Sequence, residues 1–392
     1  MMQQSFIAKN PSVLWFLLGL SVFTIVVSVL SEAAGSAIIS TSFLKTLGKT
    51  LCLCLVAIAM DVVWGYCGIL SLGHFAFFGI GGYAIGMWLM YDRTKDIVVA
   101  SLENSVLPPT PDEITDAIGT QIFGVVGSSE FPVIWAFSHS LTLQLLAVVL
   151  VPGLLALVFG WLAFRSRVTG VYLSILTQAM TLALSLYFFQ NDTGLRGNNG
   201  LSGLQNIPGL EAVSQATISL WFFWASAVAL GAGYVLFAWI VSGKLGSVIR
   251  AIRDNEARVR FLGYHVESYK LFIFTITAIV AGIAGALYYP QAGIINPAEI
   301  APIASIYLAV WVAIGGRGRL YGAVIGAAVV SLMSSWFTGG SAPDINLGFY
   351  VIKWTDWWLV LLGLTFVAVT LFFPRGIGGL FDLLLKRKED TA

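Results

Sequence analysis

The sequence predicts an all-α protein, a polytopic transmembrane helical bundle of about ten spans, and three observations predict it. Of the 392 residues, 58% are hydrophobic and 10% are charged, whereas about 25% are charged in ordinary globular proteins. The charges are clustered, so that long uncharged stretches separate them, as between Lys9 and Glu32 and between Glu211 and Lys244. Each stretch is long enough for the roughly 20 apolar residues that cross a hydrocarbon core.

Residues 1–392 are expected to form a single transmembrane domain. Its spans are predicted at about 13–30, 47–66, 72–91, 140–164, 168–189, 218–242, 270–290, 302–315, 320–337 and 357–373. The first span has the alternative of a signal peptide, but its apolar run is longer than a typical signal core. Residues 65–73 are too apolar for an ordinary loop, which predicts that a helix breaks inside the membrane there.

The orientation follows from the distribution of Lys and Arg, which concentrate in cytoplasmic connections. Of the 21 such residues, fifteen fall in one alternating set of connections and six in the other. The richer set is therefore expected to be cytoplasmic, with both termini inside. The two longest outside loops are 92–131 and 190–217. The first is acidic and contains Pro108, Pro109 and Pro111, so it is expected to be extended or loosely ordered.

The composition also excludes several classes of function. A net charge of +1 gives no sign of a nucleic-acid partner. The run Gly48-Lys49-Thr50 resembles the end of a phosphate-binding loop, but Phe43 stands where that loop needs a glycine, so no nucleotide site is expected in this chain. Neither a catalytic cluster nor a metal or cofactor site is predicted, because no nucleophile–base or metal-ligand spacing is present.

The segment 243–270 predicts an amphipathic helix that begins at Ser247. At 100° per residue, one 80° arc of this helix is apolar; it holds Val248, Ile252, Val259 and Leu262. The far side is basic, with Arg250, Arg253 and Arg260. Gly263 is expected to end the helix. Such a helix can lie on lipid, cap the bundle, or dock into another protein with its apolar arc in a groove.

A polar stripe runs along the predicted span 168–189. It consists of Ser174, Thr177, Gln178, Thr181 and Ser185. Because uncharged polar groups are costly in hydrocarbon, the stripe must face protein or water. It either lines the path of a small neutral solute or makes ordinary hydrogen bonds between helices.

Asp61 is the only formal charge between Lys49 and Asp92. An acid within a membrane is a candidate for function, so Asp61 is a second candidate for the solute pathway. The alternative is a buried structural acid that bonds to Ser71 or His74.

Two runs resemble the membrane subunits of the branched-chain amino acid ABC importer family. They are Trp64-Gly65-Tyr66-Cys67-Gly68-Ile69-Leu70-Ser71-Leu72-Gly73-His74-Phe75-Ala76-Phe77-Phe78 and Arg250-Ala251-Ile252-Arg253-Asp254-Asn255-Glu256-Ala257. The resemblance extends from about Leu55 to Leu380. It implies that the second run is the coupling helix, which docks on an ATPase. The implied ATPase-coupling residues are Arg250, Ile252, Arg253, Asp254, Glu256, Leu262 and Gly263.

Four further stretches look like the C-type permease of urea importers within that family. They lie at 166–172, 177–179, 197–201 and 312–318, whereas the loop 92–131 matches no family pattern. The resemblance implies a permease subunit that moves urea or a short amide into the cell, for nitrogen acquisition, across the bacterial inner membrane. It also implies a homologous second permease subunit, a periplasmic solute-binding protein, and two ATP-binding subunits that carry ATP and Mg²⁺.

Two alternatives to urea import remain open. The same machine could carry branched-chain amino acids, although a zwitterion calls for a charged or helix-terminus contact that the uncharged stripe lacks. A facilitative channel or secondary transporter would need no coupling helix.

Overall fold

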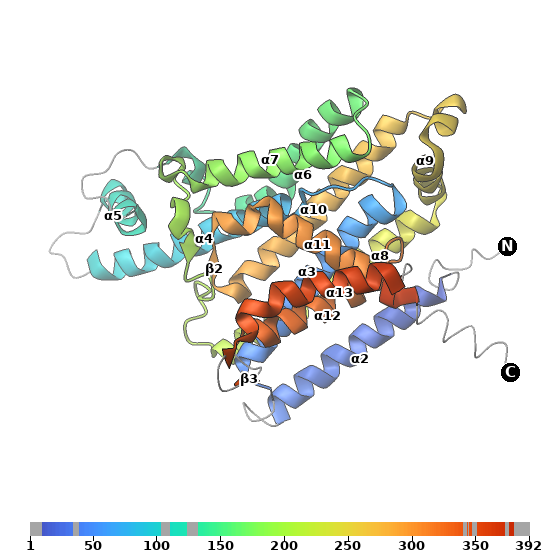
Figure 1. Cartoon of the computed structure of the whole chain (residues 1–392). Coiled ribbons are helices and arrows are strands. Elements are labelled where there is room, and N and C mark those ends of the chain that lie inside the picture. Colours follow the sequence, from blue (N-terminus) through green and yellow to red (C-terminus); the bar gives the residue numbers. More distant parts are fainter. Residues whose placement is uncertain are drawn as a thin grey trace, which may run out of the picture.

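The computed structural model describes residues 10–33, 39–102, 110–123, 132–339, 343, 345–346, 351–372 and 376–379, and these are predominantly helical (Figure 1). The first half contains α2 (Pro11–Ala33), α3 (Thr41–Asp61), α4 (His74–Leu102), α5 (Pro111–Phe123), α6 (Leu141–Arg165) and α7 (Val171–Phe189). The second half contains α8 (Gln215–Ser242), α9 (Lys244–Phe261), α10 (Val266–Ala292), α11 (Pro302–Gly315), α12 (Leu320–Thr338) and α13 (Trp354–Phe372).

Short elements join these helices. A π-helical turn, Val62–Tyr66, continues α3, and single 3₁₀ turns occur at Val133–Trp135, Asn191–Thr193, Gly197–Asn199 and Pro297–Ile300. Two antiparallel pairs of two-residue strands complete the described structure. They are β1 (Leu201–Ser202) with β2 (Ile294–Ile295), and β3 (Ile345–Asn346) with β4 (Val351–Ile352).

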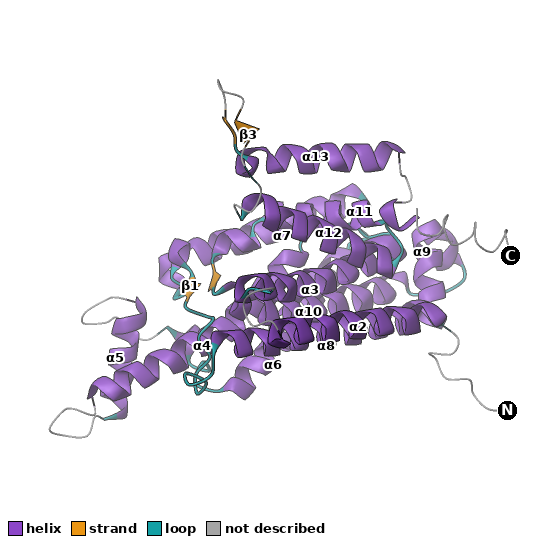
Figure 2. Cartoon of the chain, turned by 90° about the horizontal axis from the view of Figure 1, so that it is seen from below, coloured by secondary structure: helices purple, strands orange, loops and turns teal. Residues whose placement is uncertain are grey.

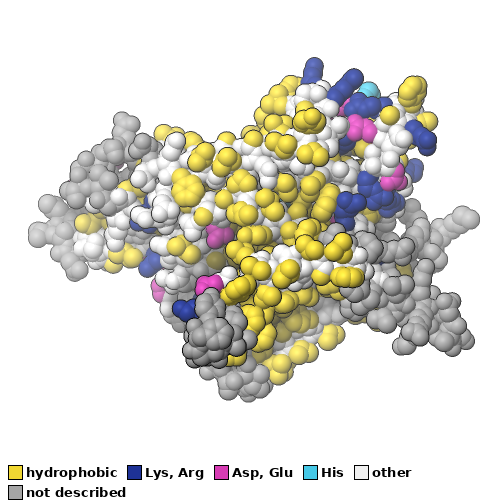
Figure 3. Space-filling view, in the orientation of Figure 1, with side chains coloured by type: hydrophobic (Ala, Val, Ile, Leu, Met, Phe, Trp, Pro, Cys, Tyr) yellow, Lys and Arg dark blue, Asp and Glu magenta, His cyan; other side chains and the backbone are white. Residues whose placement is uncertain are grey.

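Each predicted span coincides with a described helix, which confirms the all-α fold. Seven helices are long and apolar enough to cross a membrane: α2, α3 with its π turn, α6, α7, α8, α10 and α12. The predicted number of ten spans is not confirmed, since α11, for example, has only 14 residues. A band of hydrophobic side chains covers the middle of the molecule, and Lys and Arg gather at the end that carries α9 (Figure 3).

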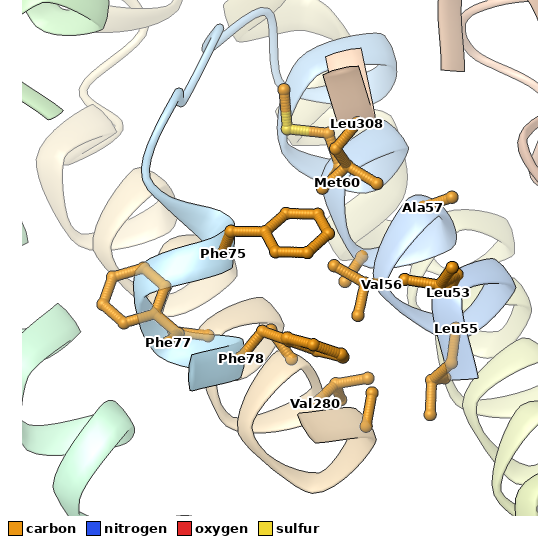
Figure 4. Packing of buried hydrophobic residues seen from close by; sticks show 14 of the residues in the cluster. Leu53, Leu55, Val56, Ala57, Met60, Phe75, Phe77, Phe78, Val280 and Leu308 are labelled. Carbon is orange, nitrogen blue, oxygen red and sulfur yellow. The ribbon is translucent and has the colours of Figure 1, made fainter. Parts of the chain in front are cut away.

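Helix α3 forms the centre of the bundle and packs against α8, α10 and α12 (Figure 2). Every residue from Thr50 to Val63 is buried, which explains why this stretch is apolar on all sides rather than along one stripe. Phenylalanines from the start of α4 meet α3 and α10 in this core, where Figure 4 shows Phe75, Phe77 and Phe78. At the periphery, α2 packs on α8 and exposes side chains such as Trp15.

Helices α4 and α10 approach closely because both contribute glycines at the crossing. A Cβ atom added to Gly81 would lie 2.0 Å from the carbonyl oxygen of Gly282. Small residues let the two backbones touch, as they do in other membrane helix pairs.

The expectation that 92–131 is an extended or loosely ordered loop is wrong for its described part. Helix α4 continues to Leu102, and residues 111–123 form α5. The reason is tertiary: α5 packs against α4 with Ile118 and Ile122 fully buried, so it has an apolar face to cover. Glu113 accepts a hydrogen bond from the backbone N–H of Thr110 and caps the start of α5. Residues 103–109 and 124–131 lie outside the described residues, as do both termini.

Candidate functional site

The candidate site begins at α9, which carries the predicted coupling residues. The helix starts at Lys244, three residues earlier than predicted, and is kinked at Asn255. There the backbone is extended (φ −159°, ψ 93°), and the Asn255 side chain accepts a hydrogen bond from the N–H of Arg258 at 3.0 Å. Asn255 thus caps a second helical half, and its short polar side chain explains why the helix breaks at this position. Gly263 adopts φ +86° directly after the helix, as its predicted role as terminator requires.

Most of the apolar arc faces the protein's own interior, which agrees with the alternative that this helix caps the bundle and not with an arc that fills a partner's groove. Ile252 is 3% exposed and Val259 is 5% exposed, and both pack with Val266 of α10. Only Leu262 projects outward, at 76% exposed, beside Phe261 at 95%. The surface free to meet another protein is therefore the tip of α9, and Phe261 is a residue that the sequence analysis missed. The signal was available, since two large apolar residues directly precede the terminating glycine.

Several charges of α9 hold the segment in place. Glu256 accepts hydrogen bonds from Arg260 at 2.8 Å and from Lys270 of α10 at 2.6 Å. Burial alone would raise the pKa of Glu256, but these bonds outweigh it and keep that pKa below its usual value. Arg250 donates to the carbonyl of Val241 at the end of α8. The carboxylate of Asp254 remains largely exposed, although it pairs with Arg253.

Between α3 and α4 the chain leaves the helical conformation, as the sequence predicted. We call residues 67–73 the broken segment; it follows the π-helical turn Val62–Tyr66 and precedes His74. Its backbone is largely buried, so its polar groups need partners. The N–H groups of Cys67, Gly68 and Ile69 bond back to carbonyls of residues 62–64.

The polar stripe of α7 supplies the other partners of the broken segment. Ser174 donates to the carbonyl of Leu70 at 2.7 Å, and Thr177 accepts from the N–H of Leu72 at 3.0 Å. Thr181 donates to its own helix and lies 3.4 Å from the carbonyl of Leu72. These hydroxyls are buried, and so is Ser185, whose hydroxyl bonds to the carbonyl of Leu182. Four of the five stripe residues thus make backbone hydrogen bonds.

Gln178 differs from the other stripe residues. Its side chain is half-buried, and within the described part of the chain it makes no hydrogen bond. An amide without a partner in a span is able to exchange donor and acceptor bonds with a polar molecule.

Asp61 is fully buried at the end of α3, and its partner is neither Ser71 nor His74. Its oxygen Oδ1 accepts a hydrogen bond of 2.7 Å from the N–H of Gly318, in the connection between α11 and α12. Gly65 lies one turn further on and fits tightly between these groups. A Cβ at Gly65 would lie 2.3 Å from Asp61 Oδ1 and 2.4 Å from the nitrogen of Gly318.

Arg253 joins α9 to this same place. Its Nη1 donates to the carbonyl oxygen of Gly65 at 2.8 Å. A Cβ at Gly68, where φ is +78°, would lie 2.9 Å from Cγ of Arg253. The structure thus brings Asp61 and Arg253 together at the π-helical turn, whereas the stripe of α7 holds the middle of the broken segment. A cavity of about 170 Å³ lies beside them and is lined by α9, the broken segment, Thr169 and Lys270, among others.

Comparisons with known proteins identify relatives among membrane permeases. The chain is similar to the high-affinity branched-chain amino acid transport system permease protein LivM of Escherichia coli (strain K12), with 26% identity over 62% of this chain and 59% of that protein. It is also similar to the probable branched-chain amino acid transport permease protein LivH of Methanocaldococcus jannaschii, with 29% identity over 40% of this chain and 48% of that protein. The ribose import permease protein RbsC of Haemophilus influenzae is 22% identical over 48% of this chain and 58% of that protein.

The matches therefore span less than two thirds of the length of these relatives. No solved structure matches the chain. The family model described as branched-chain amino acid transport system / permease component matches residues 42–370, a range that includes α9, the broken segment and α7. The chain belongs to this family of membrane permeases.

Proposed function

We propose that the chain is the transmembrane permease subunit of an ATP-driven importer, in which separate subunits bind and hydrolyse ATP. One observation carries the proposal: α9 exposes the apolar tip Phe261–Leu262, while Arg253 of the same helix is bonded to the break in the bundle at Gly65. Coupling of ATP hydrolysis to transport requires a helix that contacts both the ATP-binding partner and the membrane spans. Helix α9 has an exposed end for the first contact and a bond to an interrupted span for the second.

The α9 end is proposed to be the cytoplasmic one, with both termini on that side. The excess of Lys and Arg in its connections supports this orientation. The described C-terminal residues lie at the same end, since the Tyr321 hydroxyl is 3.5 Å from the carbonyl of Gly378. In this orientation, residues 92–131 and 190–217 face the periplasm of a bacterial inner membrane.

The partner of the α9 tip is proposed to be an ATP-binding subunit. Phe261 and Leu262 are suited to a groove, and the exposed Asp254 and Arg258 beside them are suited to a polar rim. As the resemblance to ABC importers implies, the remaining proposed partners are a second ATP-binding subunit, a homologous permease and a periplasmic solute-binding protein. A channel or secondary transporter would have no use for such a tip.

We propose urea or a short amide as the solute. The stretches 166–172, 177–179, 197–201 and 312–318 support it, together with the unpartnered amide of Gln178. Branched-chain amino acids are a second candidate, which the similarity to LivM favours.

Uptake by a strain that lacks this chain tests both proposals. The deletion strain, its complemented derivative and the parent strain receive ¹⁴C-urea or ¹⁴C-leucine at micromolar concentration, with and without depletion of ATP. We expect urea uptake to be lost in the deletion strain and to require ATP in the parent. Loss of leucine uptake instead would identify leucine as the solute and would still support an ATP-driven importer. Solute uptake that persists after ATP depletion would refute the importer itself.

A further inference from the structure

Arg253 divides its bonds between the surface of α9 and the bundle, because its side chain is 36% exposed and pairs with Asp254, while its guanidinium group also reaches a backbone carbonyl of the bundle. Its Nη1 bonds to Gly65 at 2.8 Å, and its Cγ packs against Gly68, so it contacts the chain on both sides of the point where the π-helical turn ends. Neither position tolerates a side chain without displacing Arg253 or Asp61. π-Helical turns are frequent at functional sites.

The broken segment continues from this contact to α7. Three hydrogen bonds connect them, Ser174 to Leu70, Leu72 to Thr177 and Thr181 to Leu72, and Gln178 follows Thr177 in α7. Three N–H groups at the start of the segment bond back to the π-helical turn, and the side chains of α7 hold Leu70 and Leu72 further along. The cavity of about 170 Å³ between α9 and the segment leaves space for one to move relative to the other.

The kink of α9 divides its attachments. The second half is tied to α10 through Glu256 and Lys270. The first half packs Ile252 on α10 and is the half that bonds, through Arg253, to Gly65 in the π-helical turn directly before the broken segment. Asn255 lies between the two halves and has a non-helical backbone. The exposed tip belongs to the second half, so movement of the tip reaches Arg253 through the kink at Asn255.

We infer that Arg253 is a positioning residue for transport: its bond to Gly65 passes movement of α9 to the broken segment and, through Ser174 and Thr177, to α7. This inference rests on the proposed function. It assigns to Arg253 a role inside the permease, distinct from contact with an ATP-binding subunit.

The test uses the complete importer in proteoliposomes, with ATP hydrolysis and solute uptake measured in the same vesicles. The solute is whichever of urea and leucine the wild-type complex imports. Arg253→Gln removes the charged donor, and we expect the number of solute molecules moved per ATP to fall by about tenfold, the effect of losing one charge-assisted hydrogen bond. Arg253→Lys keeps a charged donor and should recover part of the ratio. Arg165→Gln is the control, because it removes an equivalent charge from the end of α6, away from Gly65.

Each other outcome overturns the inference. An unchanged ratio in Arg253→Gln would show that the bond transmits nothing. A proportional fall of hydrolysis and uptake would assign Arg253 to docking alone. If the Arg253→Gln complex does not assemble, Thr177→Val decides: it removes the acceptor for Leu72 and should lower the same ratio, whereas Thr177→Ser should not. A normal ratio in Thr177→Val refutes the route. Failure of the proposed function looks different, since the wild-type complex would then show no ATP-dependent uptake.

Discussion

Asp61 shows how one buried carboxylate organises the α9 end of the bundle. Its oxygen Oδ1 holds the N–H of Gly318 in the connection between α11 and α12, and the next helical turn contains Gly65. In the same connection Arg317 stands over the ring of Trp64, 5.2 Å from its centroid. These contacts tie the α11–α12 connection to the π-helical turn. Direct contact with solute stays a prediction.

At the residue scale we predict that Asp61→Asn is milder than Asp61→Leu. The amide oxygen of Asn still accepts from Gly318, whereas Leu leaves a buried N–H without a partner, which costs about 1–3 kcal/mol. The amount of protein in the membrane and its thermal unfolding temperature report the difference. Equal, wild-type-like behaviour of the two variants would show that the carboxylate is not needed.

At the scale of elements, α9 has two surfaces, one packed against its own chain and one exposed at its tip. The buried surface, with Ile252 and Val259, fixes the helix to its own chain, and the exposed tip is free. Because the two surfaces are separate, we expect a substitution at the tip to change association with a partner without changing the fold. The same division applies to α7, where the hydroxyls hold the broken segment and Gln178 remains without a partner.

The tip predicts a variant that separates docking from folding. Phe261→Asp places a charge where an apolar contact is expected, and we predict that binding of the ATP-binding subunit weakens by about tenfold or more, as at other interface hot spots. The thermal unfolding temperature of the isolated permease should not change. The matched control is Val133→Asp, since Val133 is 85% exposed and lies between α5 and α6, far from α9 in the sequence. Co-purification from detergent measures binding, and equal binding by both variants would exclude the tip.

At the scale of the whole molecule, the proposed function requires the bundle to carry a polar solute through an apolar interior. Each hydrogen bond that the solute loses on leaving water costs about 1–3 kcal/mol unless the protein replaces it. Within the described spans, the hydroxyls of the α7 stripe are already bonded to backbone, which leaves Gln178 as the member able to supply such bonds. The remaining bonds of the path would come from the homologous permease.

We therefore predict that Gln178→Leu slows uptake several-fold and leaves assembly intact. Ser185→Ala, on the same stripe, should affect uptake less, because its hydroxyl is occupied by the carbonyl of Leu182. Initial rates of solute uptake, corrected for the amount of assembled complex, distinguish the two variants. Unchanged uptake in the Gln178→Leu strain would remove Gln178 from the path.

The sequence by itself determined the apolar helices of the bundle and the family. Long uncharged apolar runs leave few alternatives to membrane helices, because an unpaired backbone in hydrocarbon is too costly. The same rule predicted the break at 65–73, where an apolar stretch contains glycines at positions 65, 68 and 73. Gly263 ended α9 as predicted, since a glycine adopts the left-handed conformation at little cost.

Tertiary structure decided which side of each element is used and which distant residues meet. The apolar arc of α9 predicted an exposed docking surface, but helical periodicity does not distinguish an arc that faces a partner from one that faces the chain itself. Asp61 meets Gly318, 257 positions away, and Leu72 meets Thr177, 105 positions away. Such pairs form only when whole helices pack together, and a local sequence pattern does not predict that packing. Helix α5 was missed for the same reason, because its short apolar face becomes helical where α4 is present to bury Ile118 and Ile122.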